Sequence, residues 1–322
     1  MLHSVAARQH NLQDKAANLN LRSGVQHKPW FLRLFAEFIR EMMMKRKNIV
    51  RMIALLGCTV TATSALALDA VSVDVPRTAA KSGGFVGLGV GYSPDYEGSD
   101  EYEAVPAPFG RYVWGSGRYV NLGGTQGSER AGRLSLNIVS RDWSEVFEFG
   151  PLLQYRMKRD DDVDNSQVSR MEEVDAATEA GLFAGINTGP WSAQLAFASD
   201  VSDEHSGTVV YLKGGYRTDL SDKLQIKFGV STAWASDDYM ETYFGVDATD
   251  SARSGLSQYS ASSGIKDVGL NVTGNYQFNQ KWGLVGALGY TRMLNDAEDS
   301  PVVDDAGDKN QYKAVVAVTY SF

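Results

Sequence analysis

Apolar and polar side chains alternate at every second position in segment after segment of this chain. Residues 267–278, 281–293 and 311–322 all follow this pattern, and most carry an aromatic side chain near each end. The apolar set of the last segment consists of Tyr312, Ala314, Val316, Val318, Tyr320 and Phe322. Because successive side chains of a β-strand point to opposite faces, each segment predicts a strand with one apolar face and one polar face.

Apolar faces bounded by aromatics are typical of strands that face lipid around a polar lumen. Lipid offers no partners to backbone polar groups, so a sheet in a membrane must close on itself. A soluble sandwich also alternates, but its buried face rarely carries aromatics at both ends of successive strands. After Leu68 no segment approaches the roughly 20 apolar residues of a membrane helix. We therefore predict an all-β fold, a closed antiparallel transmembrane β-barrel.

About twelve strands are expected, with ten as the alternative because the third and fourth are weakly patterned. The expected strands are 84–93, 104–114, 118–124, 131–140, 146–159, 174–188, 190–200, 207–219, 222–236, 266–279, 281–293 and 311–322. Their connections alternate between short and long, as in barrels with short periplasmic turns and longer extracellular loops. The turns expected on the periplasmic side are two to six residues long. Pro106, Pro108 and Pro151 fall inside expected strands, where each removes a ladder donor, so we expect bulges or strand ends there.

The first 83 residues contain a predicted secretory signal. Residues 44–67 combine a basic stretch, an apolar run and a small-x-small cleavage site at Ala65 and Ala67, which is typical of a signal peptide. Residues 1–43 are interpreted as upstream translation from a start codon assigned too early, or as a leader with a short amphipathic helix at 29–42. Residues 68–83 would then form a periplasmic N-terminal segment, and residues 84–322 the outer-membrane barrel.

Charge and cysteine content narrow the classes of function. The chain has 31 Lys+Arg and 39 Asp+Glu, and residues 1–67 contribute ten of the former but three of the latter, so the mature chain is acidic. A nucleic-acid partner is therefore not expected. The one cysteine, Cys58, lies within the signal segment in a lipoprotein-like context. Unless it is lipidated there, the mature chain has no thiol chemistry.

Few residues suggest chemistry. His205 follows Asp203 and Glu204 in an expected outer loop; we interpret it as solvated, with a rim enzyme as the alternative. The acidic runs 160–164 and 304–308 are interpreted as solvated surface that divalent ions bridge to lipopolysaccharide. Lumen-facing candidates carry both charge signs and indicate a generic polar lumen: Lys213, Arg217, Lys227 and Glu179. No catalytic, metal or cofactor site is expected.

Several stretches resemble one known family. Residues 92–99 (YSPDYEGS), 243–246 (YFGV) and 296–301 (DAEDSP) are the most distinctive, within a similarity from about Gly83 to Phe322. The chain resembles the MipA/OmpV family of outer-membrane proteins of Gram-negative bacteria. Its 43-residue leader departs from the family pattern.

The resemblance implies a barrel without catalytic activity. MipA-like members act as scaffolds for a murein lytic transglycosylase and a bifunctional penicillin-binding synthase, which links peptidoglycan cutting to synthesis. Alternatives are a small-solute porin, or a surface barrel of OmpV type in adhesion and osmotic adaptation. The short periplasmic turns leave limited surface for periplasmic partners, so both alternatives stay open.

The last strand predicts where the protein is inserted. A terminal aromatic preceded by apolar residues resembles the signal recognised by the barrel assembly machinery, and here it would consist of Phe322, Tyr320, Val318 and Val316. We therefore expect an outer-membrane location, with membrane lipid and lipopolysaccharide around the barrel.

Overall fold

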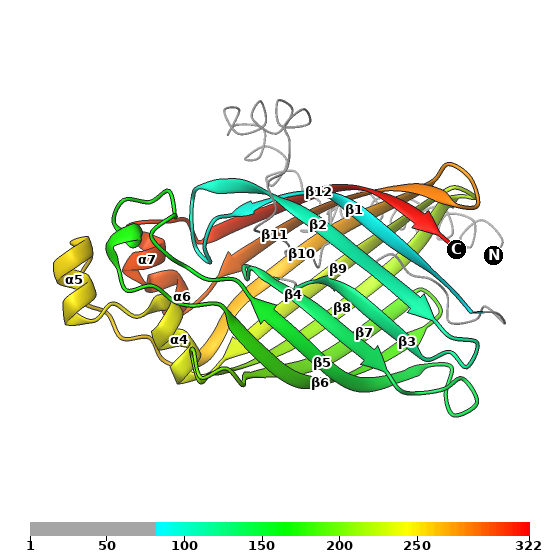
Figure 1. Cartoon of the computed structure of the whole chain (residues 1–322), viewed down its shortest axis with the longest axis horizontal. Helices are drawn as coiled ribbons and strands as arrows, with labels where there is room; N and C mark the ends of the chain where they lie inside the picture. Colours follow the sequence, from blue (N-terminus) through cyan, green and yellow to red (C-terminus); the bar gives the residue numbers. More distant parts are fainter. Residues whose placement is uncertain (1–81, 126) are drawn as a thin grey trace, which may run out of the picture. The chain divides into compact units, whose positions relative to one another are not determined.

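The computed structural model describes residues 82–125 and 127–322, and these form a closed antiparallel barrel of twelve strands (Figure 1). Each strand pairs with its neighbours in the sequence, and the last strand pairs with the first. The strands are β1 (Gly83–Pro94), β2 (Tyr102–Val113), β3 (Tyr119–Gly124), β4 (Ala131–Asn137), β5 (Phe147–Arg156), β6 (Ala177–Thr188), β7 (Trp191–Asp200), β8 (Thr208–Ser221), β9 (Leu224–Ala235), β10 (Gly264–Gln277), β11 (Trp282–Met293) and β12 (Asn310–Ser321). The predicted strand number is confirmed, and β3 and β4 are separate strands.

The two ends of the barrel sequence close the sheet. β1 and β12 pair antiparallel from Phe85↔Ser321 to Tyr92↔Ala314. Beyond that ladder, Gly84 and Phe322 exchange two backbone hydrogen bonds, each 3.0 Å long. The aromatic ring of Phe322 stacks on Tyr112 of β2, with 6.2 Å between centroids.

The alternation in sequence corresponds to the two faces of the barrel wall. In β12, Val316 and Val318 are exposed on the outside, while Val315 and Ala317 are buried inside. Aromatic pairs lie near both rims, for example Trp282 with Tyr320 near one rim and Tyr92 with Tyr102 near the other. These positions match the two aromatic belts of a barrel in lipid.

Most connections on one rim are short, and all the helices of the described residues lie on the other rim. The short connections are 114–118, 138–146, 189–190, 222–223 and 278–281. The opposite rim carries η2 (Val168–Arg170), α4 (Asp237–Phe244), α5 (Ala248–Ser254), α6 (Asp296–Asp299) and α7 (Pro301–Asp304), which gather at one end of the barrel (Figure 1). Within the described ranges, none of the helices is long and apolar enough to cross a membrane. The short-turn rim is periplasmic by the usual barrel rule, although connection 138–146 exceeds the predicted length.

The prolines differ from expectation. Pro106 and Pro108 lie inside β2, and the β1–β2 register passes through both without a shift, so the expected bulge is wrong. Over the described residues, β3 pairs only with 110–113 of β2. The prolines are tolerated because the other edge of this part of β2 has no ladder to interrupt. At Pro151 the expectation is partly met, because the β4–β5 pairing ends at Leu152 while β5–β6 continues.

The predicted leader 1–43, the signal peptide 44–67 and its cleavage residues Ala65 and Ala67 lie outside the described residues, as does most of segment 68–83.

Candidate functional site

A buried ion network occupies the half of the lumen nearest the helix-bearing rim. At its centre, the Lys266 Nζ atom lies 2.6 Å from Glu97 Oε1, 2.7 Å from Asp267 Oδ2 and 3.3 Å from Glu129 Oε1. The Lys266 side chain has no solvent exposure. Charges removed from water are tolerated only when they are paired and hydrogen-bonded, so these four residues depend on one another.

A β-bulge places two of these charges side by side. In a regular strand, Lys266 and Asp267 would point to opposite faces. The β9–β10 register shifts between Ile265 and Asp267, which leaves Lys266 as the extra residue. Both side chains are consequently buried inside the barrel, as expected for a bulge that redirects a side chain.

Arg156 forms the second centre of the network. Its Nε atom donates to Glu179 Oε1 at 2.7 Å and its Nη1 atom donates to Tyr239 Oη at 2.8 Å. The same guanidinium lies 3.6 Å from Glu129, and Tyr211 Oη donates to Glu129 at 2.9 Å. Arg156 and Lys266 thus share Glu129, so the two centres are continuous.

His205 belongs to this network, which corrects its interpretation as a solvated loop residue. The residue is only 3% exposed, and its Nδ1 atom accepts a hydrogen bond from the Gly207 backbone N–H at 3.0 Å. Its other ring nitrogen, Nε2, lies 3.0 Å from Glu179 Oε1. The loop turns inward because Asp200 accepts from the backbone N–H groups of His205 and Ser206.

The three sequence stretches that carry the family resemblance meet above the network. Tyr96, from the first stretch, donates through its hydroxyl to the Ala306 carbonyl at 2.7 Å. Ser300, from the third, donates to the carbonyl of Phe244 in the second at 2.6 Å. Tyr239 Oη, at the start of α4, donates to Glu97 at 2.6 Å. These contacts tie the loops after β1, β9 and β11 into one cap over the lumen.

Glu97 is held in its charged form by this arrangement. Burial alone would raise the pKa of Glu97, but the positive charges of Lys266 and Arg156, with hydrogen bonds from Lys266 and Ser128, lower that pKa to about 2. The carboxylate therefore remains ionised throughout the physiological range.

The network has the chemistry of a seal. Cations and carboxylates alternate, the side chains are packed against one another, and the described residues contain no group of three or more His, Cys, Asp or Glu side chains placed to hold a metal.

The expected exposure of the acidic runs is confirmed for Asp161, Asp162, Asp304 and Asp305, which all face solvent.

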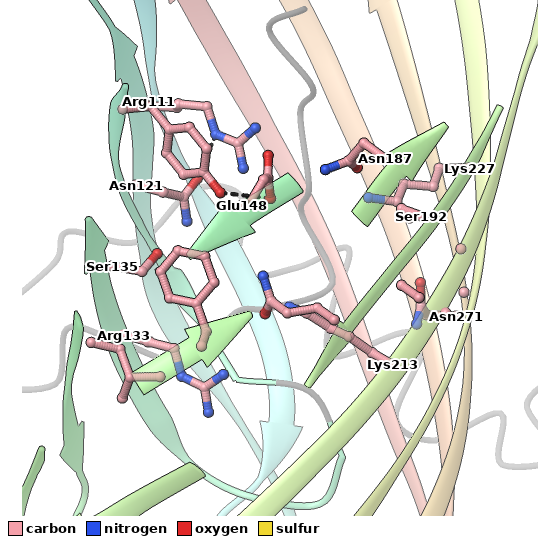
Figure 2. Close-up of a pocket in the computed structure, with 18 of the residues that line it drawn as sticks. Arg111, Asn121, Arg133, Ser135, Glu148, Asn187, Ser192, Lys213, Lys227 and Asn271 are labelled. Carbon is pink, nitrogen blue, oxygen red and sulfur yellow. Dashed lines mark hydrogen bonds between the residues drawn. The ribbon is translucent and has the colours of Figure 1, made fainter. Parts of the chain in front are cut away.

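A cavity occupies the periplasmic half of the lumen (Figure 2). About 100 Å³ of it can hold the centres of water molecules. The charged side chains that line it are Arg111, Arg133, Lys213, Lys227 and Glu148. Neutral polar side chains complete the lining: Asn121, Ser135, Asn187, Ser192, Gln194 and Asn271.

The four predicted lumen residues do face the interior, but they do not form one lining. Lys213 and Lys227 line the cavity, and Arg217 lies directly opposite Lys227 in the β8–β9 pair. Glu179 belongs to the buried network instead, because it is bonded to Arg156 and His205. The interpretation as a generic polar lumen is thus corrected to a balanced network above a mainly basic cavity.

Sequence reasoning missed other members of both sites. Arg111 and Arg133 stand at inward positions of β2 and β4, and the alternation could have identified them. Lys266 could not have been found this way, because the bulge reverses its direction. Glu97 and Glu129 lie in loops, where periodicity gives no direction.

Comparisons with known proteins agree with the fold. A family model described as MltA-interacting protein MipA matches residues 86–322. The MltA-interacting protein of Escherichia coli (strain K12) is 27% identical over 241 residues, which cover 74% of this chain and 90% of that protein. The outer membrane protein OmpV of Vibrio cholerae is 28% identical over 164 residues, covering 51% of this chain and 61% of OmpV. Among solved structures, a KdgM porin aligns with a TM-score of 0.36 and 13% identity over 74% of this chain and 99% of the porin.

Proposed function

Because the chain belongs to the MltA-interacting protein (MipA) family and is an outer-membrane barrel of a Gram-negative bacterium, we propose that it is a non-catalytic scaffold for peptidoglycan-remodelling enzymes. The partners would be a murein lytic transglycosylase and a bifunctional penicillin-binding synthase. The observation that carries this proposal is the family match over the whole barrel, together with a relative named for its interaction with MltA.

The filled lumen favours an interaction role over the alternative of a small-solute porin. A porin needs a continuous aqueous path, whereas Arg156, Lys266, Glu129 and Glu179 are fully buried in its extracellular half. A planar bilayer containing the purified barrel should therefore remain silent. Steady single-channel steps would favour the porin.

The periplasmic rim offers one surface broad enough for a partner. Connections 114–118 and 138–146 are joined by a hydrogen bond from the Arg141 N–H to the Ser116 carbonyl at 2.7 Å. The Arg141 side chain also donates to the Gly115 carbonyl. Trp143, in the longer connection, is 71% exposed. An exposed tryptophan on an ordered turn is the kind of residue that anchors protein interfaces, so we place the partner site here.

The test is a pull-down of murein hydrolases and synthases by the purified barrel, with Trp143→Ser as the variant. We expect binding to weaken about tenfold or more, as for an interface anchor. Lys281→Ser, in the periplasmic connection 278–281, is the matched control and should bind normally. Failure of an intact barrel to retain any peptidoglycan enzyme would contradict the proposal. Equal loss in both variants would refute the location.

An OmpV-type surface role is the second candidate. It is favoured by the extracellular position of the larger, acidic loops, and binding of intact barrels to host cells or matrix would support it.

A further inference from the structure

A second, smaller cavity lies at the extracellular end of β5, beside the cap. About 20 Å³ of it can hold the centres of water molecules, which is enough for about one particle of that size. The charged residues that line it, among those described, are Glu97, Arg130, Arg156, Lys158 and Arg159. Four of these side chains are cationic and one is a carboxylate, so the partner of each cation decides the charge of the cavity.

Three of the four cations are neutralised by carboxylates. Arg130 pairs with Glu103, Lys158 with Asp160 and Arg156 with Glu179. Glu97 is itself bound to Lys266, at 2.6 Å. These groups therefore contribute little net charge to the cavity.

Arg159 is the exception. The residue is 6% exposed, and its Nη1 atom donates to the Tyr243 backbone carbonyl at 3.0 Å, while its Nε atom has no hydrogen-bond partner. No carboxylate of the described residues accepts a hydrogen bond from it. Burial lowers the pKa of the Arg159 guanidinium, and the charge of Asp250 offsets this only in part. Because a buried charge is costly unless it is paired, an anion beside Arg159 would be stabilising.

The unpartnered groups that line this cavity can all donate. Besides Arg159 Nε, they are Arg130 Nε and the Tyr243 hydroxyl, which are buried without a hydrogen-bond partner among the described residues. Both oxygens of Glu97, by contrast, are engaged by protein donors. A buried water molecule needs acceptors for its own protons, whereas an anion needs only donors. The cavity therefore has the hydrogen-bonding pattern of an anion site.

Two of these donors are positioned by contacts that leave them available. Arg159 and Val174 exchange two backbone hydrogen bonds, of 2.9 and 2.8 Å. The Tyr243 ring lies 4.5 Å from the Tyr239 ring and 5.6 Å from the His205 ring, measured between centroids. Because neither set of contacts uses Arg159 Nε or the Tyr243 hydroxyl, the site is organised before a ligand arrives.

We propose that this cavity binds one small monovalent anion, a halide such as chloride, between Arg159, Arg130 and the Tyr243 hydroxyl. A halide ion is only slightly larger than a water molecule, so it suits the space better than phosphate or a larger oxyanion. The bound ion joins the segment after β5 to α4 and to the β3–β4 loop, and thereby stabilises the cap. This inference does not depend on the scaffold role, since it rests on the donors of the cavity alone.

Thermal unfolding of the full-length barrel in detergent tests the proposal. Sodium chloride replaces sodium gluconate at constant ionic strength, so that general screening is unchanged and only the size of the anion differs. A ligand that binds only the folded state stabilises it once its concentration exceeds the dissociation constant. The unfolding midpoint should therefore rise with the logarithm of the chloride concentration above that point. A midpoint that does not depend on chloride would overturn the proposal.

Two variants assign the effect to this cavity. Tyr243→Phe removes only a hydroxyl without a hydrogen-bond partner among the described residues, so the variant should fold normally. The chloride concentration at which its midpoint begins to rise should increase about tenfold or more, the effect of losing one hydrogen bond to an ion. Arg159→Gln should abolish the rise.

The matched control is Tyr259→Phe. It removes a hydroxyl that donates to the Asp296 carbonyl at 3.1 Å, and it should respond to chloride as the wild type does. An equal chloride response in Tyr243→Phe and the wild type would overturn the proposal.

Crystals grown in sodium bromide show the position of the ion directly. Anomalous scattering at the bromine absorption edge should give a peak between Arg159 and Tyr243. Bromide found only at other places on the barrel would overturn the proposal as well.

Discussion

Replacing Lys266 with methionine should destabilise the barrel strongly. The substitution nearly conserves side-chain volume but removes a charge that lies within 3.3 Å of Glu97, Glu129 and Asp267. Removing one partner of a buried ion pair costs about 3–5 kcal/mol, because the remaining charge stays buried without compensation. With three carboxylates affected and Arg156 only 3.6 Å from Glu129, we expect the upper part of that range.

The assay is equilibrium unfolding in guanidinium, followed by tryptophan fluorescence of the barrel in detergent. The matched control is Lys309→Met, which removes a 2.8 Å ion pair with Glu298 at the surface. An exposed pair contributes about 0–1 kcal/mol, so this control should unfold almost as the wild type does.

A second variant separates charge from packing. If buried charge is the cause, adding Glu97→Gln to Lys266→Met should recover part of the lost stability, because the excess of carboxylates falls by one. The reasoning is refuted if Lys266→Met unfolds within about 1 kcal/mol of the wild type. It is also refuted if the double variant is less stable than the single variants predict by addition.

Three further predictions follow from individual side chains. The pKa of Glu97 is lowered from 4.5 to about 2, so its contribution to stability is complete above about pH 4.5 and is lost as the pH falls towards 2. The thermal unfolding midpoint should be level from pH 7 to 5 and should fall below pH 4.5, with a smaller fall in Glu97→Gln. A midpoint that already falls between pH 7 and 6 would contradict this. If Phe322 is part of the assembly signal, Phe322→Ala should lower the yield of heat-modifiable barrel in the outer membrane severalfold while secretion continues. The control Phe278→Ala removes a similarly exposed aromatic that also packs against a neighbouring ring. An equal loss of yield in both variants would mean that Phe322 acts only as a residue of the aromatic belt. His205→Ala should cost about 1–3 kcal/mol of stability, since it leaves a hydrogen bond of Glu179 unmade, and no ester or peptide hydrolysis should distinguish it from the wild type; an activity lost only in the variant would contradict the non-catalytic proposal.

The barrel was predictable because the side-chain pattern that produces it can be recognised within each single strand. A lipid-facing wall requires an apolar side chain at every second position, so Val316 and Val318 identify their own face without any knowledge of the partner strand. The same period predicts that Lys213, Arg217 and Lys227 point inward. Strand ends at Asn137 and Arg156 were less predictable, because local pairing and not side-chain pattern decides where those ladders stop.

The interior arrangement was not predictable in the same way. Whether an inward charge is paired depends on residues distant in sequence, such as Glu97 and Lys266, which come together only when the sheet closes. His205 looked like a loop residue beside two acidic neighbours, yet Asp200 turns that loop inward. Lys266 also breaks the alternation through its bulge. Periodicity therefore predicts the wall of the barrel and says little about what fills it.

The shared position of Glu129 has a consequence for the order of events during folding. Its carboxylate contacts Arg156 of β5, Tyr211 of β8 and Lys266 of β10, while its own loop joins β3 to β4. These contacts require eight consecutive strands, so no fragment ending before β10 can complete them. Sealing of the lumen is therefore a late step, and an incompletely inserted chain remains unsealed at its extracellular end until that step has occurred.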